Sequence, residues 1–430
     1  MLIILWLLST CFIHLSIGIP LRNEDGSNIN FNKREVVYDG DIKLTNRNSV
    51  TSLEGASRTK RSVELNALKW PNNTINYHYH HTMDNTSIEY MEAAIEYIRK
   101  RTCINFINTT IAESQMRILD DGQCSSAVGF QKLGVQDLRF GSECLNRGAA
   151  VHELMHALGL IHEQSRYDRD EYLHINESVV SKELRPNVAM RNRSDIYNLT
   201  PFDYGSVMLY FPDAVGNGSI QPKNDDYKYT MGNMGVSFYD MVKINKHYEC
   251  EKKCDTQLKC ENGGYTNPAN CSICICPNGY QGILCDQLPT ASATHEATTT
   301  WVSNLIRFET KSNTTLINPG YAYIVITAPA RKTIEIQLTD LIDFECYEGC
   351  NTNGVEVKFN GDPRITNPIF CCDNEINSTR IFKSKHNPTI ISLYSTFGSS
   401  IVGYKARYTD EDYTLGSKTT NGYDEFEYYE

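Results

Sequence analysis

Three histidines and a glutamate in one short stretch have the types and the spacing of a metal site. His152 and His156 are four residues apart, so both lie on one face of a helix, with Glu153 beside the first of them. A helix that continued to His162 would spread the three imidazoles over about 15 Å. Gly159 allows the helix to end and the chain to turn back, because glycine adopts the left-handed conformation that such a turn needs. The stretch therefore predicts three imidazoles that converge on one metal ion.

The predicted ligand set suits hydrolytic zinc chemistry. Three imidazole nitrogens leave coordination positions open for water, and this open coordination separates catalytic from structural zinc sites. Zinc lowers the pKa of its water to about 7, so that hydroxide forms at neutral pH. Glu153 is placed to accept the proton. The alternative is a closed structural zinc site, which is disfavoured because the sequence offers no fourth local Cys or His ligand.

Composition and the first residues predict a secreted protein of several domains. The 430 residues exceed one ordinary domain, and the net charge of -11 excludes the basic surface that nucleic-acid binding needs. Residues 1–18 have the short apolar run of a signal peptide, and we expect no membrane span after it. Of the 15 cysteines, Cys11 lies in this segment, which leaves an even number suited to an oxidising compartment.

The polar segment 19–61 is predicted to be a propeptide. It ends in Arg58-Thr59-Lys60-Arg61, directly before the strand-like alternation begins. Such a basic run is either a solvated loop or a processing site, and its position favours cleavage by a proprotein convertase after Arg61.

The elements that must position the histidines are those of an α+β domain. The sequence predicts a strand after Trp70, then an amphipathic helix over 87–101 with Thr86 or Ser87 as its N-cap. Further short strands precede the histidine helix. A turn-rich stretch at 200–213 and a last helix near 237–250 follow it.

Two disulfide-containing modules are predicted after residue 250. Six cysteines between 254 and 285 must close a segment too small to bury a core, and their spacing resembles an EGF-like domain over 251–286. A linker over 287–302 leads to a strand-rich β-sandwich over 303–410, which resembles a CUB domain. The pairing of Cys346, Cys350, Cys371 and Cys372 is left open. The acidic tail, 411–430, is predicted to be disordered.

The catalytic stretch resembles the astacins, a family of metzincin zinc endopeptidases. His152–Asp170 follows the astacin pattern, and so do Thr102–Phe106, Cys124–Gly129 and Asp203–Tyr210. The resemblance covers about 62–250. It implies a two-lobed α+β protease domain with an active-site cleft, ahead of the EGF-like and CUB-like domains.

The resemblance also implies catalytic roles. His152, His156 and His162 bind one zinc ion. Glu153 acts as general base on the water and then as proton donor to the leaving amine. Tyr210 is a further ligand that swings away to stabilise the oxyanion.

Structural and regulatory roles follow from the same resemblance. Met208 lies beneath the metal, and Glu163 contacts the new amino terminus after processing. Asp41 matches a propeptide aspartate that binds zinc in place of water, although a solvated carboxylate is the alternative. The implied disulfides, including those of the EGF-like domain, are Cys103–Cys250, Cys124–Cys144, Cys254–Cys271, Cys260–Cys274 and Cys276–Cys285.

Four positions in three stretches depart from the family pattern. Leu160 stands where Phe is usual, and Leu209 where His is usual. Gly232-Asn233-Met234 replaces the frequent Gly-Gln-Arg, which puts in doubt a preference for acidic residues after the scissile bond.

The sequence thus predicts a secreted, zymogen-type zinc endopeptidase acting on extracellular proteins, such as matrix or cuticle. The rival is an inactive astacin-like scaffold that serves binding or adhesion. Because the modules after residue 250 contain no candidate ligand or base, we expect their removal to leave peptide hydrolysis nearly intact while reducing the turnover of large matrix substrates. Candidate N-glycosylation sites are Asn72, Asn85, Asn108, Asn176, Asn192, Asn198, Asn217, Asn270, Asn313 and Asn377.

Overall fold

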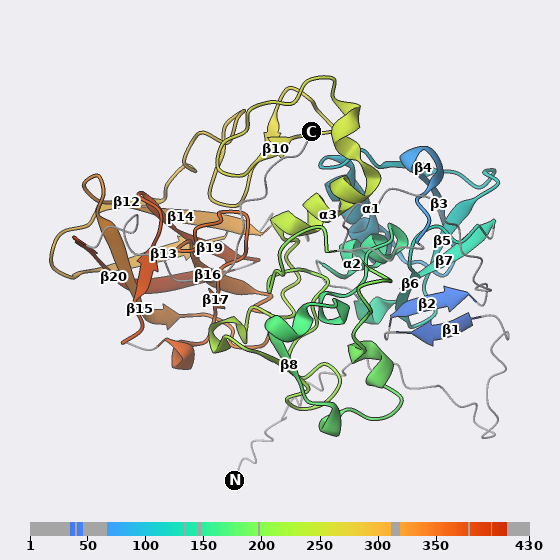
Figure 1. Ribbon diagram of the computed structural model, residues 1–430, viewed down its shortest axis with the longest axis horizontal. Coiled ribbons are helices and arrows are strands. Elements are labelled where there is room, and N and C mark those ends of the chain that lie inside the picture. The colour runs from blue at the N-terminus through green and yellow to red at the C-terminus, as the bar shows by residue number, and fades with distance from the viewer. Residues whose placement is uncertain are drawn as a thin grey trace, which may run out of the picture.

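The computed structural model has a mixed α+β part and a β-sandwich, with a small disulfide-rich module between them along the chain (Figure 1). It describes residues 35–38, 41–45 and 67–410, apart from 133, 145–147, 197, 311–318, 377–378 and 397. The expected signal peptide, the processing site at Arg61 and the acidic tail lie outside these residues. Among the described helices, none is long and apolar enough to cross a membrane.

The α+β part is built on a seven-stranded mixed sheet. In their order across the sheet, its strands are β1 (Glu35–Tyr38), β2 (Ile42–Thr45), β6 (Cys124–Ala127), β7 (Val135–Phe140), β5 (Gln115–Leu119), β3 (Thr74–Tyr79) and β4 (Asn105–Asn108). β2 pairs with β6 in parallel, and β1 pairs with β2 as a hairpin. The segment expected to be a propeptide therefore extends the sheet at one edge.

Three α-helices pack in this part of the chain: α1 (Asn85–Arg99), α2 (Ala149–Ala157) and α3 (Phe238–Tyr248). Met91, Ile95 and Ile98 of α1 are fully buried in the core, while Ile88 is only partly buried. Helix α3 begins with a capping box, in which Ser237 and Asp240 bond each other's backbone amides.

The start of α1 differs from the sequence prediction. Asp84 is the N-cap in place of Thr86 or Ser87, and its side chain accepts the amide of Ser87 at 2.6 Å. Four successive residues here are good caps, so sequence alone leaves the start ambiguous. The carboxylate is the strongest acceptor among them, because a charged acceptor makes the shorter and stronger bond.

The second half of the α+β part consists mainly of turns. Its one described strand pair joins β8 (Leu173–Ile175) to β9 (Ile220–Pro222). Short 3₁₀ helices lie at Pro71–Asn73, Ser142–Cys144, Glu163–Ser165, Arg169–Glu171, Glu177–Val179, Arg185–Val188, Asp225–Tyr227 and Cys250–Lys253, and at Asp373–Glu375 in the sandwich. A separate apolar cluster that includes Leu173, Phe202 and Ile220 holds these turns together.

Seven disulfides cross-link the described chain. Five are the pairs that the resemblances imply: Cys103–Cys250, Cys124–Cys144, Cys254–Cys271, Cys260–Cys274 and Cys276–Cys285. The pairing left open by the sequence is Cys346–Cys372 and Cys350–Cys371. The small module itself has only β10 (Tyr265–Thr266) and β11 (Cys274–Ile275) among its described residues, so cystines replace a core there.

Two sheets form the sandwich. One has the order β12 (Ala293–Glu296), β14 (Gly320–Thr327), β19 (Thr389–Ser395), β16 (Asn353–Val357) and β17 (Ile369–Phe370); the other has the order β13 (Val302–Glu309), β20 (Ser399–Thr409), β15 (Thr333–Ile342) and β18 (Phe382–Ser384). The sequence predicts a linker over 287–302, but residues 293–296 form β12. That strand pairs in parallel with β14, a partner that composition cannot indicate.

The candidate glycosylation sites differ in accessibility. Exposed asparagines are Asn72, Asn85, Asn108, Asn192, Asn217 and Asn270, and Asn176 is half-buried. Both polar atoms of the Asn198 side chain are buried, which disfavours modification there. Asn313 and Asn377 lie outside the described residues.

Candidate metal centre

The histidine helix ends where the sequence predicts a turn. Helix α2 stops at Ala157, and Gly159 follows with a φ of +101°. A Cβ on Gly159 would lie 3.1 Å from Nε2 of His247, so space as well as conformation favours glycine. The reversal brings His162 back beside the two helical histidines.

The three imidazoles converge. Their Nε2 atoms lie 3.0 Å apart for His152 and His156, 3.2 Å for His156 and His162, and 3.2 Å for His162 and His152. On the far side of the rings, Nδ1 of His152 bonds the carbonyl of Val207 at 2.8 Å and Nδ1 of His156 bonds that of Leu160 at 2.9 Å. These carbonyls keep the proton on Nδ1, so Nε2 offers its lone pair to a metal.

Asp41 completes the cluster from the start of β2. Its carboxylate oxygens lie 3.1 Å from Nε2 of His152, 3.1 Å from that of His162 and 3.6 Å from that of His156. Burial alone would raise the pKa of Asp41, but the surrounding imidazoles outweigh burial and hold that pKa well below its usual value. All four ligand atoms lie within 4.8 Å of one another, and three imidazoles with one carboxylate are a donor set that fits zinc.

Glu153 lies in the interior beside the cluster. Its side chain is buried, and its Oε2 has no hydrogen-bond partner among the described residues. Burial raises the pKa of Glu153 well above its usual value, and the charge of Asp41 adds to the rise. A carboxylate in such a place has a high affinity for a proton, which is the property of a general base.

The turn at 203–210 contacts the stretch that carries the third histidine. Met208 is fully buried, and its carbonyl accepts the amide of Glu163 at 2.8 Å. The ring of Tyr210 lies 4.5 Å from the ring of His162, and its amide bonds Oε1 of Gln164 at 3.3 Å. The residues Leu160 and Leu209, which depart from the family pattern, are both buried in apolar clusters.

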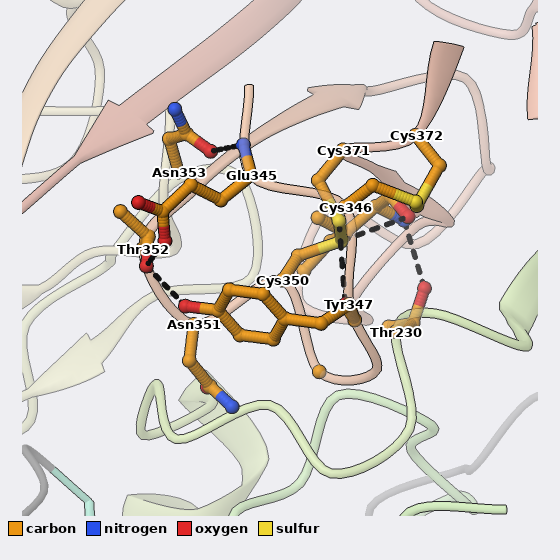
Figure 2. Close-up of a disulfide and its surroundings, with 12 residues drawn as sticks. Thr230, Glu345, Cys346, Tyr347, Cys350, Asn351, Thr352, Asn353, Cys371 and Cys372 are labelled. Carbon is orange, nitrogen blue, oxygen red and sulfur yellow. Dashed lines mark hydrogen bonds between the residues drawn. A yellow bond between two sulfur atoms is a disulfide. The ribbon is translucent and has the colours of Figure 1, made fainter. Parts of the chain in front are cut away.

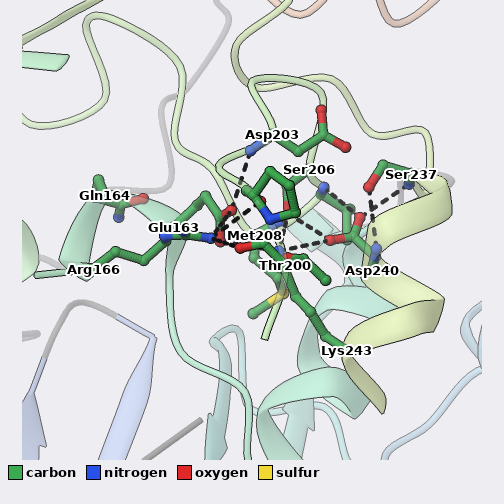
Figure 3. A network of polar contacts seen from close by, with 12 residues as sticks. Glu163, Gln164, Arg166, Thr200, Asp203, Ser206, Met208, Ser237, Asp240 and Lys243 are labelled. Carbon is green, nitrogen blue, oxygen red and sulfur yellow. Dashed lines mark hydrogen bonds and ion pairs between the residues drawn. The ribbon is translucent and has the colours of Figure 1, made fainter. Parts of the chain in front are cut away.

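Glu163 is held by a buried polar network (Figure 3). Its Oε1 accepts Arg166 at 3.0 Å, and its Oε2 accepts Lys243 at 2.9 Å. Lys243 also lies 3.4 Å from Oδ1 of Asp240, whose other contacts include the Ser206 hydroxyl at 2.5 Å. Both carboxylate oxygens of Glu163 thus have a cationic partner before processing. The expected amino-terminal partner, Ser62, lies outside the described residues, so that contact remains a prediction.

Sequence reasoning missed Lys243 as a partner of Glu163. A lysine on a helix is usually solvated, yet this one is 2% exposed. Burial opposes its charge, but Glu163 and Asp240 outweigh burial and raise the pKa of Lys243. The one local signal is Asp240, three residues earlier on the same face of α3.

Lys243→Met should destabilise the precursor strongly, because it leaves two buried carboxylates without their shared cation. Removing one partner of a buried ion pair costs about 3–5 kcal/mol. Urea unfolding followed by circular dichroism measures the change. Lys246→Met is the control, since Lys246 lies on the same helix and bonds only the Leu199 carbonyl in the described structure, near solvent. Equal stability of both variants would contradict the network.

Asp203→Asn should stabilise the protein above pH 6. Asp203 is fully buried, and burial, with the charge of Asp240, raises its pKa to about 6. The folded state therefore binds a proton that the unfolded state has lost, and stability falls as pH rises from about 4 to 6, by roughly 2–3 kcal/mol. Asparagine keeps Oδ1, which accepts the amides of Gly205 and Thr366.

The measurement is urea unfolding of wild type and Asp203→Asn at pH 4 and pH 7.5. The variant should be more stable at pH 7.5, and the difference should shrink at pH 4. The exposed Asp255→Asn is the matched control and should show no such difference. A constant difference at both pH values would argue against titration of Asp203.

Comparison with known proteins supports the assignment of these residues to a zinc site. Residues 62–249 match the model of the family described as Astacin, a family of peptidases. Zinc metalloproteinase nas-17 of Caenorhabditis elegans is 41% identical over 98% of this chain and 98% of its own length. Zinc metalloproteinase nas-16 of the same nematode is 40% identical over 80% of this chain and 76% of its own length. High choriolytic enzyme 1, a hatching enzyme zinc-protease from Oryzias latipes, is 31% identical, covering 43% of this chain and 94% of its own, with a TM-score of 0.39. Three imidazoles and one carboxylate converge as a zinc-compatible ligand set, and nas-17 is 41% identical along almost its whole length. The chain therefore belongs to the astacin family of zinc metalloproteinases.

Proposed function

We propose that this protein is secreted as a latent precursor and, after processing, cleaves peptide bonds of extracellular proteins. The observation that carries the proposal is the position of Asp41, whose carboxylate lies among the three Nε2 atoms that face the metal position. An acidic ligand at that position competes with the water that hydrolysis needs.

His152, His156 and His162 would hold zinc, which when bound activates water and polarises the substrate carbonyl. Glu153 takes one proton as the water oxygen bonds to the carbonyl carbon. As the carbon–nitrogen bond breaks, Glu153 returns that proton to the leaving amine nitrogen. The hydroxyl of Tyr210 donates a hydrogen bond to the oxyanion and keeps its proton. The position of its ring against that of His162 supports this role.

The propeptide is proposed to be removed after Arg61 by a basic-specific proprotein convertase. Its β2 strand pairs with β6, and the carbonyl of Asp41 accepts the amide of Ser126 at 2.9 Å. This pairing is a second anchor beside the carboxylate. Cutting after Arg61 is needed to release β2, because its backbone pairing with β6 persists even when the Asp41 carboxylate is lost as a ligand.

An activity assay of the processed full-length protein on casein and denatured collagen tests the proposed peptidase function. Cleavage should stop when a chelator removes zinc and should return when zinc is added. The uncut Arg61→Ala precursor should stay silent. Activity that survives full removal of zinc would contradict the proposal, and zinc binding without any cleavage would favour the rival, an inactive extracellular scaffold. Extracellular matrix and cuticle proteins are the substrate classes to test next.

A further inference from the structure

The sandwich contacts the α+β part, which we call the catalytic part, at several places, including Thr366 with Asp203 and Asp362 with Tyr239. One further contact is made by a loop that two disulfides hold. We call residues 346–353 the clamp loop. Two disulfides, Cys346–Cys372 and Cys350–Cys371, tie this loop to another segment of the same domain (Figure 2). The segment of the catalytic part that it meets is residues 230–236, which precede helix α3. Thr230, at the start of this segment, is also tied to the sandwich, because its hydroxyl accepts the amide of Ile369 at 2.8 Å.

Side-chain amides make the contact specific. Oδ1 of Asn351 accepts the amide of Met234 at 2.6 Å, and Nδ2 of Asn351 donates to the carbonyl of Gly232 at 3.3 Å. In the other direction, Nδ2 of Asn233 donates to the carbonyl of Gly349 at 2.6 Å and to the hydroxyl of Tyr394 at 3.0 Å. Asn233 is 5% exposed, so these bonds are made away from water, where an unmade one is costly.

The backbones also meet without room for side chains. A Cβ on Gly349, whose φ is +83°, would lie 2.5 Å from the carbonyl oxygen of Gly232. Within the catalytic part, a Cβ on Gly148 would collide with the carbonyl oxygen of Met234, and a Cβ on Gly232 would lie 2.5 Å from Cβ of Phe211. The segment 230–236 is therefore held between the clamp loop and two points of the catalytic part.

Those two points adjoin residues to which we assign catalytic roles. Gly148 is the N-cap of α2, the helix that carries His152 and Glu153. Phe211 directly follows Tyr210 in the chain. A shift of the segment 230–236 is transmitted to both, because close-packed backbone contacts of this kind cannot absorb it.

We propose that the clamp loop of the CUB-like domain is a positioning element of the catalytic unit, with Asn351 as its principal residue. By holding the segment 230–236, it sets the position of α2 and of Tyr210 relative to the substrate. The modules after residue 250 contribute no ligand or base, but they are not independent of the active site. This proposal predicts the opposite of the expectation that they are dispensable for peptide hydrolysis, and it rests on the peptidase function proposed above.

Asn351→Ala in the full-length processed protein tests the proposal, because it removes both amide bonds to the segment. Tyr394→Phe is the smaller change in side-chain size; it removes one acceptor from Asn233 and the donor to the carbonyl of Cys350. Asn304→Ala is the matched control: it is the same substitution in the same domain, on β13, where its amide contacts only its own strand in the described structure. The readouts are hydrogen exchange of the amides of 230–236, zinc affinity by chelator competition, and kcat and KM on a peptide series.

Misplacement of catalytic groups by 1 Å can cost about 100-fold, so we expect kcat/KM to fall about tenfold in Asn351→Ala, and less in Tyr394→Phe. Exchange at 230–236 should accelerate, zinc affinity should fall, and the control should match wild type. Faster exchange with unchanged kinetics and zinc affinity would show that the contact holds the segment 230–236 without positioning the active site, which contradicts the proposal. Unchanged exchange would show that Asn351 does not hold the segment at all. If wild type binds zinc but cleaves nothing, the peptidase function fails, while exchange and zinc affinity still decide the positioning role.

Discussion

Glu153→Ala is expected to bind zinc and to fold but to lose about 10²–10⁴-fold of kcat/KM, since general acid–base help is worth this much and Glu153 serves in both proton transfers. None of the metal ligands is altered. The fold should not suffer, because the buried carboxyl has an oxygen without a hydrogen-bond partner in the described structure and its removal leaves no partner unsatisfied.

The measurement is steady-state cleavage of a peptide substrate by processed protein, with zinc content and unfolding midpoint recorded for each variant. Glu177→Ala is the control, an exposed glutamate whose loss should change nothing. Wild-type turnover by a zinc-loaded Glu153→Ala protein would remove Glu153 from the mechanism. Loss of zinc together with activity would instead indicate that the variant damages the site.

Asp41→Ala should give an uncut precursor with partial activity. A blocked precursor has a minor open state, populated at roughly 0.1–10%, and removing the blocking ligand raises the competent fraction about 10- to 1000-fold. Activity should remain below that of mature enzyme. The pairing of Ile42 with Ser126 and of Lys43 with Ala127 still keeps the propeptide strand against the catalytic sheet.

The comparison is made in an Arg61→Ala background, so that neither protein is processed. The Arg61→Ala precursor should show no peptidase activity, whereas the Arg61→Ala/Asp41→Ala precursor should cleave the peptide. Arg61→Ala/Asp255→Ala controls for the loss of an acidic residue elsewhere and should stay silent. If the double variant with Asp41→Ala is equally silent, Asp41 is not the group that blocks the metal, and the strand pairing alone maintains latency.

Short-range patterns predicted the metal centre of this protein. His152 and His156 are one helical turn apart, and Gly159 is where the chain turns, so the convergence of three imidazoles could be predicted without a structure. Cysteine spacing likewise indicated a small module held by disulfides. The apolar stripe of α1 could be predicted as well, because its apolar residues recur with the period of the helix.

Tertiary structure alone decided the contacts between distant residues. Glu163 meets Lys243 across 80 residues, and Met234 meets Asn351 across 117. The strand at 293–296 depends on β14, and the pairing among Cys346, Cys350, Cys371 and Cys372 depends on how the sandwich folds. Neither partner in such a pair has a local pattern that identifies the other, because the contact exists only once packing brings the two segments together. The sequence by itself therefore predicted which residues form the metal centre, and the tertiary structure decided what holds them in place.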